Sequence, residues 1–357
     1  MLEALTLPLS KSAGNQFRVH PTPDYGARFI DYYFQSGNVR TFYHSQLVSS
    51  RIEAKLLDAH SKYIVGLGEL LFDVIDNKPV LGGAPVNFTI QAHQVLRRKG
   101  YQGAVAVRLG NDSLATDARR QLNQFGLTTE FIQDDPDRPT GTAIVHRKAG
   151  GHRFEIVEDV CWDYFQWNHQ LESLAANAAV VCFGTLGQRS EQSRETIRKF
   201  VEMAEQALRV FDVNIRQHYY DDDVIRHGCT NADILKLNEE ELPLVATAMK
   251  IPPASTDLLT CASLRAAGGL SHVVFTQGEK GTTVVSADGV TTGEPVNLSE
   301  NTFSDSVGAG DACTAGIVAG TPLNLSMTET VQLANSLGAY VASRHGATPT
   351  LPVELLP

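Results

Sequence analysis

The chain has 357 residues and a formal net charge of −10, and 43% of its residues are hydrophobic while 20% are charged. This length and composition suit one large α/β domain with an ample core, and the acidic balance argues against a nucleic-acid partner. No apolar run approaches the roughly 18 residues of a membrane span, so we expect no membrane partner. The five cysteines are dispersed without a C-x-x-C pair, which predicts reduced thiols in a cytoplasmic protein.

Residues 1–61 carry several aromatic side chains but show neither clean strand alternation nor a signal-peptide core. We expect them to be an N-terminal extension outside the catalytic fold, with a structure that the sequence does not predict. The domain follows and spans residues 62–357. Its first element is the apolar run at residues 63–67, which is typical of a buried parallel strand.

Two short polar motifs follow this strand, G-E-L-L-F-D at residues 68–73 and G-G-A-P-V-N at residues 82–87. Adjacent glycines and a proline before a helix predict a sharp turn, at which a small ligand can approach the backbone. Asp73 and Asn87 are short polar side chains among apolar neighbours, so they are candidates for ligand contacts. A surface turn followed by a capped helix explains the same residues without a ligand.

The middle of the chain alternates between predicted strands and helices. In order, we expect a strand at 103–109, a helix at 113–125, a hairpin of strands at 140–147 and 153–157, a strand at 180–183, a helix at 190–208 and a strand at 209–212. The A-G-G-H turn between two alternating segments indicates the hairpin. Strands and helices that alternate in this way feed one mostly parallel sheet.

The strand at residues 209–212 ends in the polar segment D-V-N-I-R, residues 212–216. Polar residues at the C-terminal end of a parallel strand lie where open α/β sheets bind ligands. Arg216 is therefore a candidate substrate contact, although pairing with a carboxylate explains it equally well.

A strand at residues 233–237 is followed directly by N-E-E-E, residues 238–241, which begins a helix. Acidic side chains in a first turn are favourable with the helix dipole, so capping alone explains them. Farther on, strands at residues 272–276 and 282–286 flank Q-G-E-K-G, which on its own predicts an ordinary hairpin turn. A capping box at Ser326 begins the last helix.

The glycine-rich stretch S-D-S-V-G-A-G-D, residues 304–311, precedes a run of small and apolar residues that is typical of a buried helix. Such a turn before a helix binds anions, because unpaired N–H groups and the helix dipole point at the ligand. Asp311 would repel a phosphate there, unless it is a base that deprotonates a hydroxyl while the amides of residues 308–310 stabilise the phosphoryl group. The alternative is a tight turn capped by Asp311 before a core helix.

The string D-S-V-G-A-G-D at residues 305–311 resembles the D-T-x-G-A-G-D signature of the ribokinase-like (PfkB) carbohydrate kinases. The two motifs within residues 68–87 resemble the sugar site of the fructokinase-like branch, and the order of the later motifs agrees with the family up to residue 352. The resemblance implies an α/β fold with a mainly parallel central sheet, helices on both faces of the sheet and a small β lid. The lid would come largely from about residues 140–160.

The same resemblance implies which residues would form the site. Its catalytic residues would be Asp311 as the base, with the backbone of Gly308, Ala309 and Gly310. Its sugar-binding residues would be Asp73, Gly82, Gly83, Asn87, Arg216 and Asp311. Its nucleotide-binding residues would be Asn238, Thr276, Gly278, Gly281, Gly308, Gly310 and Asn335. Its metal ligands would be Glu241 and Asn238 for Mg²⁺ through water, and Asp305, Val307, Val341, Arg344 and Gly346 for a monovalent cation.

These implications together predict an ATP-dependent sugar kinase that resembles fructokinases, with ATP and Mg²⁺ as cofactors and K⁺ as a further implied ion. Alternative acceptors within the kinases are 2-keto-3-deoxygluconate, ribose, a nucleoside and a sugar phosphate. Outside catalysis, the alternative is a protein of the same fold that senses a sugar or a nucleotide without turnover. The resemblance also implies a homodimer in which the lid pairs with a second subunit.

Overall fold

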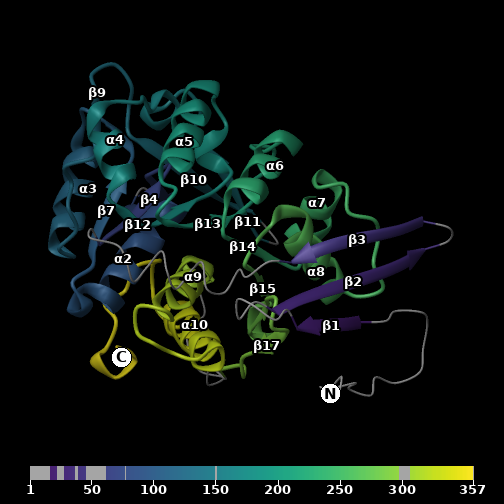
Figure 1. Cartoon of the computed structure of the whole chain (residues 1–357). Coiled ribbons are helices and arrows are strands. Elements are labelled where there is room, and N and C mark those ends of the chain that lie inside the picture. The colour runs from purple at the N-terminus through teal and green to yellow at the C-terminus, as the bar shows by residue number, and fades with distance from the viewer. Residues whose placement is uncertain are drawn as a thin grey trace.

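The computed structural model describes residues 17–21, 28–36, 39–45, 62–76, 78–148, 151–296 and 306–356. The largest sheet among them has eight strands (Figure 1). In order across the sheet these are β17 (Val290–Thr292), β16 (Thr282–Val285), β15 (His272–Thr276), β14 (Ile234–Asn238), β13 (Leu208–Asp212), β12 (Ala178–Phe183), β4 (Tyr63–Leu67) and β7 (Gln102–Ala106). The strands from β15 to β7 are parallel, and β16 and β17 add an antiparallel edge.

The large sheet is buried on both faces, because successive side chains of each strand point to opposite sides and both sides are covered. In β14, Leu235 packs on one side and Ile234 on the other. The helices on the Leu235 side are α4 (His169–Ala176), α5 (Glu191–Met203), α6 (Asp222–Asn231), α7 (Glu241–Ala248) and α8 (Asp257–Gly268). Those on the Ile234 side are α2 (Ala84–Leu96), α9 (Ala309–Ala319) and α10 (Met327–Ala342).

A second sheet has four strands in the order β11 (Gly151–Ile156), β10 (Gly141–Lys148), β5 (Leu71–Ile75) and β6 (Lys78–Gly82). The predicted hairpin is confirmed as β10 and β11, which pair antiparallel. The sequence did not predict β5 and β6, which form a second hairpin and join β10 through a parallel pairing. Half of this sheet therefore comes from the segment between the two N-terminal motifs.

Two predicted elements have different boundaries in the structure. The helix expected at residues 190–208 is α5, which ends at Met203, because the chain turns at Ala204 and enters β13 at Leu208. The strand expected at residues 103–109 is β7 followed by the short β8 (Arg108–Gly110), which pairs with β9 (Gln133–Asp135) rather than with the large sheet. The next helix, α3 (Ser113–Gln124), begins as predicted.

The described part of the N-terminal extension contains three strands that the sequence did not predict. They are β1 (Phe17–Pro21), β2 (Arg28–Ser36) and β3 (Val39–Ser45), and they form an antiparallel sheet of their own. Across the described ranges, no helix is long and apolar enough to cross a membrane.

Candidate active site

Asp311 lies in the first turn of α9 and is 8% exposed. Asn87 lies in the first turn of α2, and its Nδ2 donates a hydrogen bond to Asp311 Oδ2 at 2.9 Å. The two residues are 224 positions apart in the sequence. The structure therefore brings the candidate base into direct contact with a candidate sugar ligand, and neither is a solvent-facing cap.

The turn before α9 requires glycine at position 308. Gly308 has φ 79°, and a Cβ placed there would lie 2.6 Å from the Cα of Ala347. The Ala309 amide donates to the Ser306 carbonyl at 3.2 Å, so it is already used within the turn. The amide of Gly310 is in the first turn of α9, where no intrahelical acceptor exists, and it is oriented toward the end of the helix that attracts anions.

The environment of Asp311 changes its acid strength. Burial raises the pKa of this carboxyl group to about 6, and the nearby Asp212 carboxylate adds to the increase. Lys236, the hydrogen bond from Asn87 and Arg216 act in the opposite direction. Near neutral pH, Asp311 is thus ionised but a stronger base than an ordinary aspartate, which suits proton abstraction from an alcohol.

Asp73 lies in β5 and faces the glycine turn. A Cβ placed at Gly82 would come within 2.8 Å of Asp73 Oδ2, so the glycine leaves room for the carboxylate. Gly83 has φ 107° and precedes α2, and a Cβ there would lie 2.8 Å from the carbonyl oxygen of Glu69. The glycine pair therefore lets the backbone pass close to two acidic residues on its way to Asn87.

Glu69 is a buried carboxylic acid that the sequence analysis quoted within a motif but did not select. It is 3% exposed, and its Oε2 atom has no hydrogen-bond partner among the described residues. Burial raises the pKa of Glu69 to about 7, and its own amide, Arg216 and the Gly187 amide oppose the increase. The charge of Asp311 contributes to the increase, so the two carboxyl groups belong to the same site.

Arg216 follows β13 and is exposed, with Nη1 donating to the carbonyl of its neighbour Ile215 at 3.0 Å. Its positive charge lowers the pKa of both Glu69 and Asp311. The guanidinium is thus close enough to both acids to affect their ionisation.

A buried ion pair lies beneath the turn before α9, and the sequence analysis missed it. Lys236 Nζ lies 3.0 Å from Asp212 Oδ1, and Thr314 Oγ1 donates to Asp212 Oδ2 at 3.0 Å. These residues come from β14, β13 and α9, and all three are buried. The available signal in the sequence was a single lysine within the otherwise apolar strand I-L-K-L.

The side chains of Asn238 and Glu241 accept backbone hydrogen bonds at the start of α7. Asn238 Oδ1 accepts from the amides of Glu240 and Glu241, each at 2.9 Å. The two Glu241 oxygens accept from the amides of Ile215, at 2.8 Å, and Asn238, at 2.9 Å. Asn238 thus accepts from two amides at the start of α7, and Glu241 ties this helix to the loop after β13.

The Glu241 carboxylate can accept further hydrogen bonds beyond these two. Each of its oxygens accepts one backbone hydrogen bond and keeps a lone pair that can accept a second. Oxygen donors of this kind suit Mg²⁺ held through water. Within the described ranges, no group of three or more His, Cys, Asp or Glu side chains is arranged to hold a metal ion.

Residues predicted to bind the nucleotide lie along one edge of the large sheet. Asn238 and Thr276 are register partners at the C-terminal ends of β14 and β15. The following turn is tied to the same edge, because Lys280 Nζ lies 2.9 Å from Glu239 Oε1. Gly278 in this turn has φ 56° and open space where a Cβ would be.

Asn335 connects α10 to this region. A Cβ placed at Gly281 would lie 2.9 Å from Asn335 Nδ2, and the same Nδ2 donates to the Glu294 carbonyl at 3.0 Å. The structure thus places Gly281 and Asn335 side by side.

The predicted monovalent-cation site is only partly described. Asp305 lies outside the described residues. Val341 is buried, whereas Arg344 is exposed and stacks over the Tyr340 ring at 4.9 Å. The segment around Gly346 lies directly behind the glycine turn through the contact of Ala347 with Gly308.

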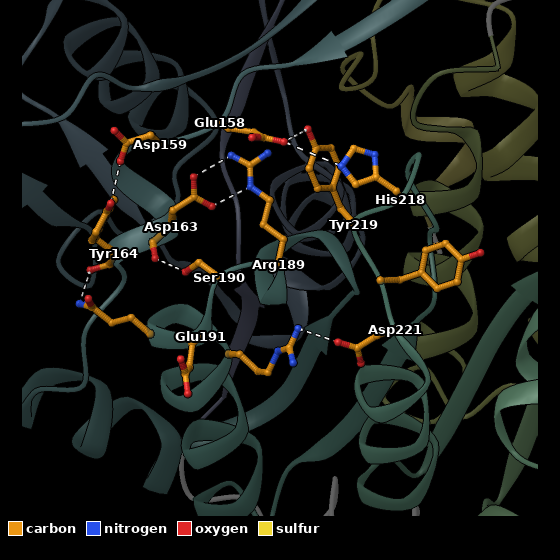
Figure 2. Close-up of a pocket in the computed structure, with 13 residues that line it drawn as sticks. Glu158, Asp159, Asp163, Tyr164, Arg189, Ser190, Glu191, His218, Tyr219 and Asp221 are labelled. Carbon is orange, nitrogen blue, oxygen red and sulfur yellow. Dashed lines mark hydrogen bonds and ion pairs between the residues drawn. The ribbon is translucent and has the colours of Figure 1, made fainter.

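A separate pocket of about 810 Å³ lies between the segment after β11, the start of α5 and residues 218–221 (Figure 2). Arg189 donates from Nε and Nη2 to the two oxygens of Asp163, each at 2.7 Å. Tyr219 donates to Glu158 Oε1 at 2.8 Å, which ties the loop after β13 to the end of β11. None of the predicted site residues lines this pocket.

Comparisons with known proteins identify the family and the fold of this chain. Residues 61–354 match the family described as pfkB family carbohydrate kinase. A fructokinase of Vibrio alginolyticus is 27% identical over 290 residues, which cover 76% of this chain and 89% of that protein. The fold is similar to that of fructokinase with bound ATP from Xylella fastidiosa, with a TM-score of 0.70, 18% identity, and coverage of 83% of this chain and 98% of that one.

A second solved structure, fructokinase from Vibrio cholerae O395 in a form with bound fructose, ADP and calcium ion, gives a TM-score of 0.66 at 20% identity. It covers 83% of this chain and 98% of that chain. The predicted fold class is confirmed by these similarities and by the mostly parallel sheet with helices on both faces.

Proposed function

The chain belongs to the pfkB family of carbohydrate kinases, and on that premise we propose that it transfers the γ-phosphoryl group of ATP to a hydroxyl group of a small sugar, with Asp311 as the base. One observation carries this assignment: a buried carboxylate at a helix N-terminus is joined at 2.9 Å to the asparagine of the Gly-Gly turn. Fructose is the first candidate acceptor, because several relatives are fructokinases and ATP or fructose is bound in solved neighbours.

Asp311 takes the proton of the sugar hydroxyl as that oxygen attacks the γ-phosphorus. The new O–P bond forms, the bond between the γ-phosphorus and the bridging oxygen breaks, and ADP leaves with the electron pair. A base whose pKa is about 6 holds the proton better than an ordinary aspartate, yet it is ionised before the reaction at neutral pH. The phosphoryl group itself needs positioning and charge stabilisation rather than covalent chemistry.

The turn before α9 supplies this stabilisation. The backbone N–H groups of Gly308 and Gly310 and the positive end of α9 lie beside Asp311, where the transferring group would arrive, whereas the Ala309 amide is used within the turn. The missing side chains of Gly308 and Gly310 let the turn pack closely on Ala347 and Lys236 behind it.

Sugar binding is assigned to residues of β5 and of the glycine turn before α2. Asp73 accepts hydrogen bonds from sugar hydroxyls, and Asn87 accepts one at Oδ1, a buried atom without a partner among the described residues. Gly82 and Gly83 let the sugar approach the backbone. Asn87 has a second task, because its hydrogen bond orients the Asp311 carboxylate. Arg216, which is exposed and close to both buried acids, can contact a distal oxygen of the acceptor.

ATP is assigned to the edge formed by Thr276, Gly278, Gly281 and Asn335. Mg²⁺, when bound, neutralises charge on the ATP phosphates. Glu241 would hold it through water while keeping its two backbone hydrogen bonds. Asn238 Oδ1 already accepts two amides, so it would hold a metal-bound water only by giving up one of them.

Substitution of Asp311 by asparagine tests the proposal. The amide has the same shape and can still accept from Asn87, so we expect a folded protein that binds ATP, while kcat falls by at least about a hundredfold. The measurement is ADP release with a panel of fructose, 2-keto-3-deoxygluconate, ribose and a nucleoside, with the exposed Asp288→Asn as the control. Turnover near that of the parent would remove Asp311 from its role. A parent protein that binds a sugar by calorimetry but forms no product would instead be a sensor.

A further inference from the structure

Lys236 is a charged residue at a position where the sheet needs none. It lies in β14 on the same face as the apolar Ile234, and it is 6% exposed. A buried ammonium is costly unless it is paired, and here Asp212 pairs with it at 3.0 Å. Replacing such a pair by apolar residues of similar volume is often neutral or stabilising, so fold stability alone does not explain the pair.

The pair is connected to the turn that faces the substrate. Asp212 uses its second oxygen to accept from Thr314 Oγ1 at 3.0 Å, and Thr314 lies one helical turn after Gly310 in α9. The same hydroxyl lies 3.1 Å from the Gly310 carbonyl oxygen. A continuous chain of polar contacts thus runs from β14 through β13 to the start of α9.

The ammonium group also lies directly beneath the turn. A Cβ placed at Gly310 would be 2.9 Å from Lys236 Nζ, so only the bare glycine backbone separates the cation from the opposite side of the turn. The carboxylate of Asp212 pairs with this ammonium group at 3.0 Å, and a paired carboxylate favours the charged form of a lysine. The ammonium therefore stays charged.

We propose that Lys236 is a positioning residue for phosphoryl transfer: anchored by Asp212, it seats the turn at residues 308–311 and holds a positive charge beneath it. This inference rests on the proposed function and adds a residue to it. Asp311 and an incoming phosphoryl group are both anionic, so they repel each other at the distance that the reaction needs. A fixed cation beneath the turn attracts both and allows them to share the site.

The test removes both charges of the pair. Lys236→Met alone would leave the buried Asp212 without its partner and is expected to destabilise the fold. The double variant Lys236→Met/Asp212→Asn avoids this, because the asparagine can still accept from Thr314. We expect it to fold, to keep its KM for ATP and sugar, and to lose kcat by on the order of a hundredfold.

The chain offers a matched control on the same two strands. Arg209 Nε lies 3.3 Å from Asp233 Oδ2, and both side chains are largely buried near the opposite, N-terminal ends of β13 and β14. Arg209→Met/Asp233→Asn removes an equivalent pair far from the turn. Its thermal unfolding reports the structural cost of losing such a pair, and its kcat should stay within about twofold of the parent.

A double variant at Lys236 and Asp212 that is folded and has the parent's kcat would overturn the inference, since the pair would then be structural. Thr314→Val provides a second test if the double variant does not fold. It removes the hydrogen bond from Thr314 in α9 to Asp212 and nearly keeps the shape of the side chain. We expect a several-fold loss of kcat at unchanged KM, and an unchanged kcat would overturn the seating role. Failure of the proposed function has a different pattern, in which the parent forms no product or Asp311→Asn keeps its turnover.

Discussion

Glu69 places a second titrating carboxyl group beside the candidate base. Its pKa is raised from 4.5 to about 7, first by burial, with the Asp311 charge adding to the effect. The folded state therefore binds this proton more tightly than the unfolded chain does. The stability from that proton is fully present below about pH 4.5 and is lost as the pH rises through about 7. At 1.36 kcal/mol per pKa unit, the loss is on the order of 3 kcal/mol.

Replacement of Glu69 by glutamine should remove this contribution, because the amide keeps the shape of the side chain but does not ionise. We expect the free energy of unfolding of the parent to fall more steeply between pH 5 and pH 8 than that of Glu69→Gln. The parent should lose on the order of 3 kcal/mol more over this range. Urea unfolding at several pH values measures the difference, with the exposed Glu130→Gln as the control. Identical pH dependence in the parent and Glu69→Gln would mean that Glu69 is not protonated in the folded state.

Site residues that lie in recognisable sequence motifs could be predicted. Residues whose role depends on contacts between segments far apart in the sequence could not. Asp311 and Asn87 stand in strings whose spacing indicates their chemistry, and the structure brings them into contact. Lys236 and Asp212 are 24 positions apart, and their importance depends on two strands being neighbours in the sheet. Glu69 lies two residues after β4, where a polar residue is ordinary, and only its burial distinguishes it.

Helix α9 carries Asp311 into the site and is buried on all sides. Its residues from Asp311 to Ala319 are buried, and it packs between α2 and α10. At Gly316 the helices α9 and α10 approach each other closely, since a Cβ there would lie 2.5 Å from the Cα of Ala334 in α10. Because the neighbouring atom belongs to the backbone, it has no rotamer by which to move away.

The substitution Gly316→Ala has two opposing effects on the free energy of unfolding, one from helix propensity and one from packing. Propensity alone predicts that the change stabilises the helix by about 1 kcal/mol. The contact with Ala334 predicts a loss of about 1–3 kcal/mol from overpacking. We expect the contact to dominate, so that the midpoint of urea unfolding falls and kcat falls with it as α9 shifts Asp311. A variant as stable as the parent, or more stable, would show that the two helices separate at little cost.

At the level of elements, the buried strands of the large sheet were predicted because each is a short apolar run with turn residues beside it. Strands β5 and β6 were missed, since Asp73 interrupts the apolar run of β5 and Pro79 that of β6. The helix expected to reach residue 208 was predicted too long, because residues 203–207 contain no glycine or proline. There the pairing of Leu208 with Val180 in β12 decides where the strand begins.

The three N-terminal strands lie outside the part of the chain that matches the family. Composition predicted one large α/β domain, and the match to the family covers residues 61–354. The three N-terminal strands were missed because adjacent aromatic residues, such as Tyr32, Tyr33 and Phe34, break the period of two that indicates a strand. Local pattern fails there, since strand pairing rather than alternation defines that sheet.

Removal of residues 1–61 tests whether the kinase part is self-sufficient. Every strand of the eight-stranded sheet comes from residue 63 onward, and in the described part of the chain β1, β2 and β3 pair only with one another. We therefore expect the chain of residues 62–357 to fold and to keep the kcat of the full chain within about twofold. Circular dichroism, thermal unfolding and ADP release with the sugar that the panel identifies measure this. Loss of folding or of kcat would show that the N-terminal sheet is part of the catalytic domain. A changed KM at constant kcat would instead place that sheet at the entrance to a substrate site.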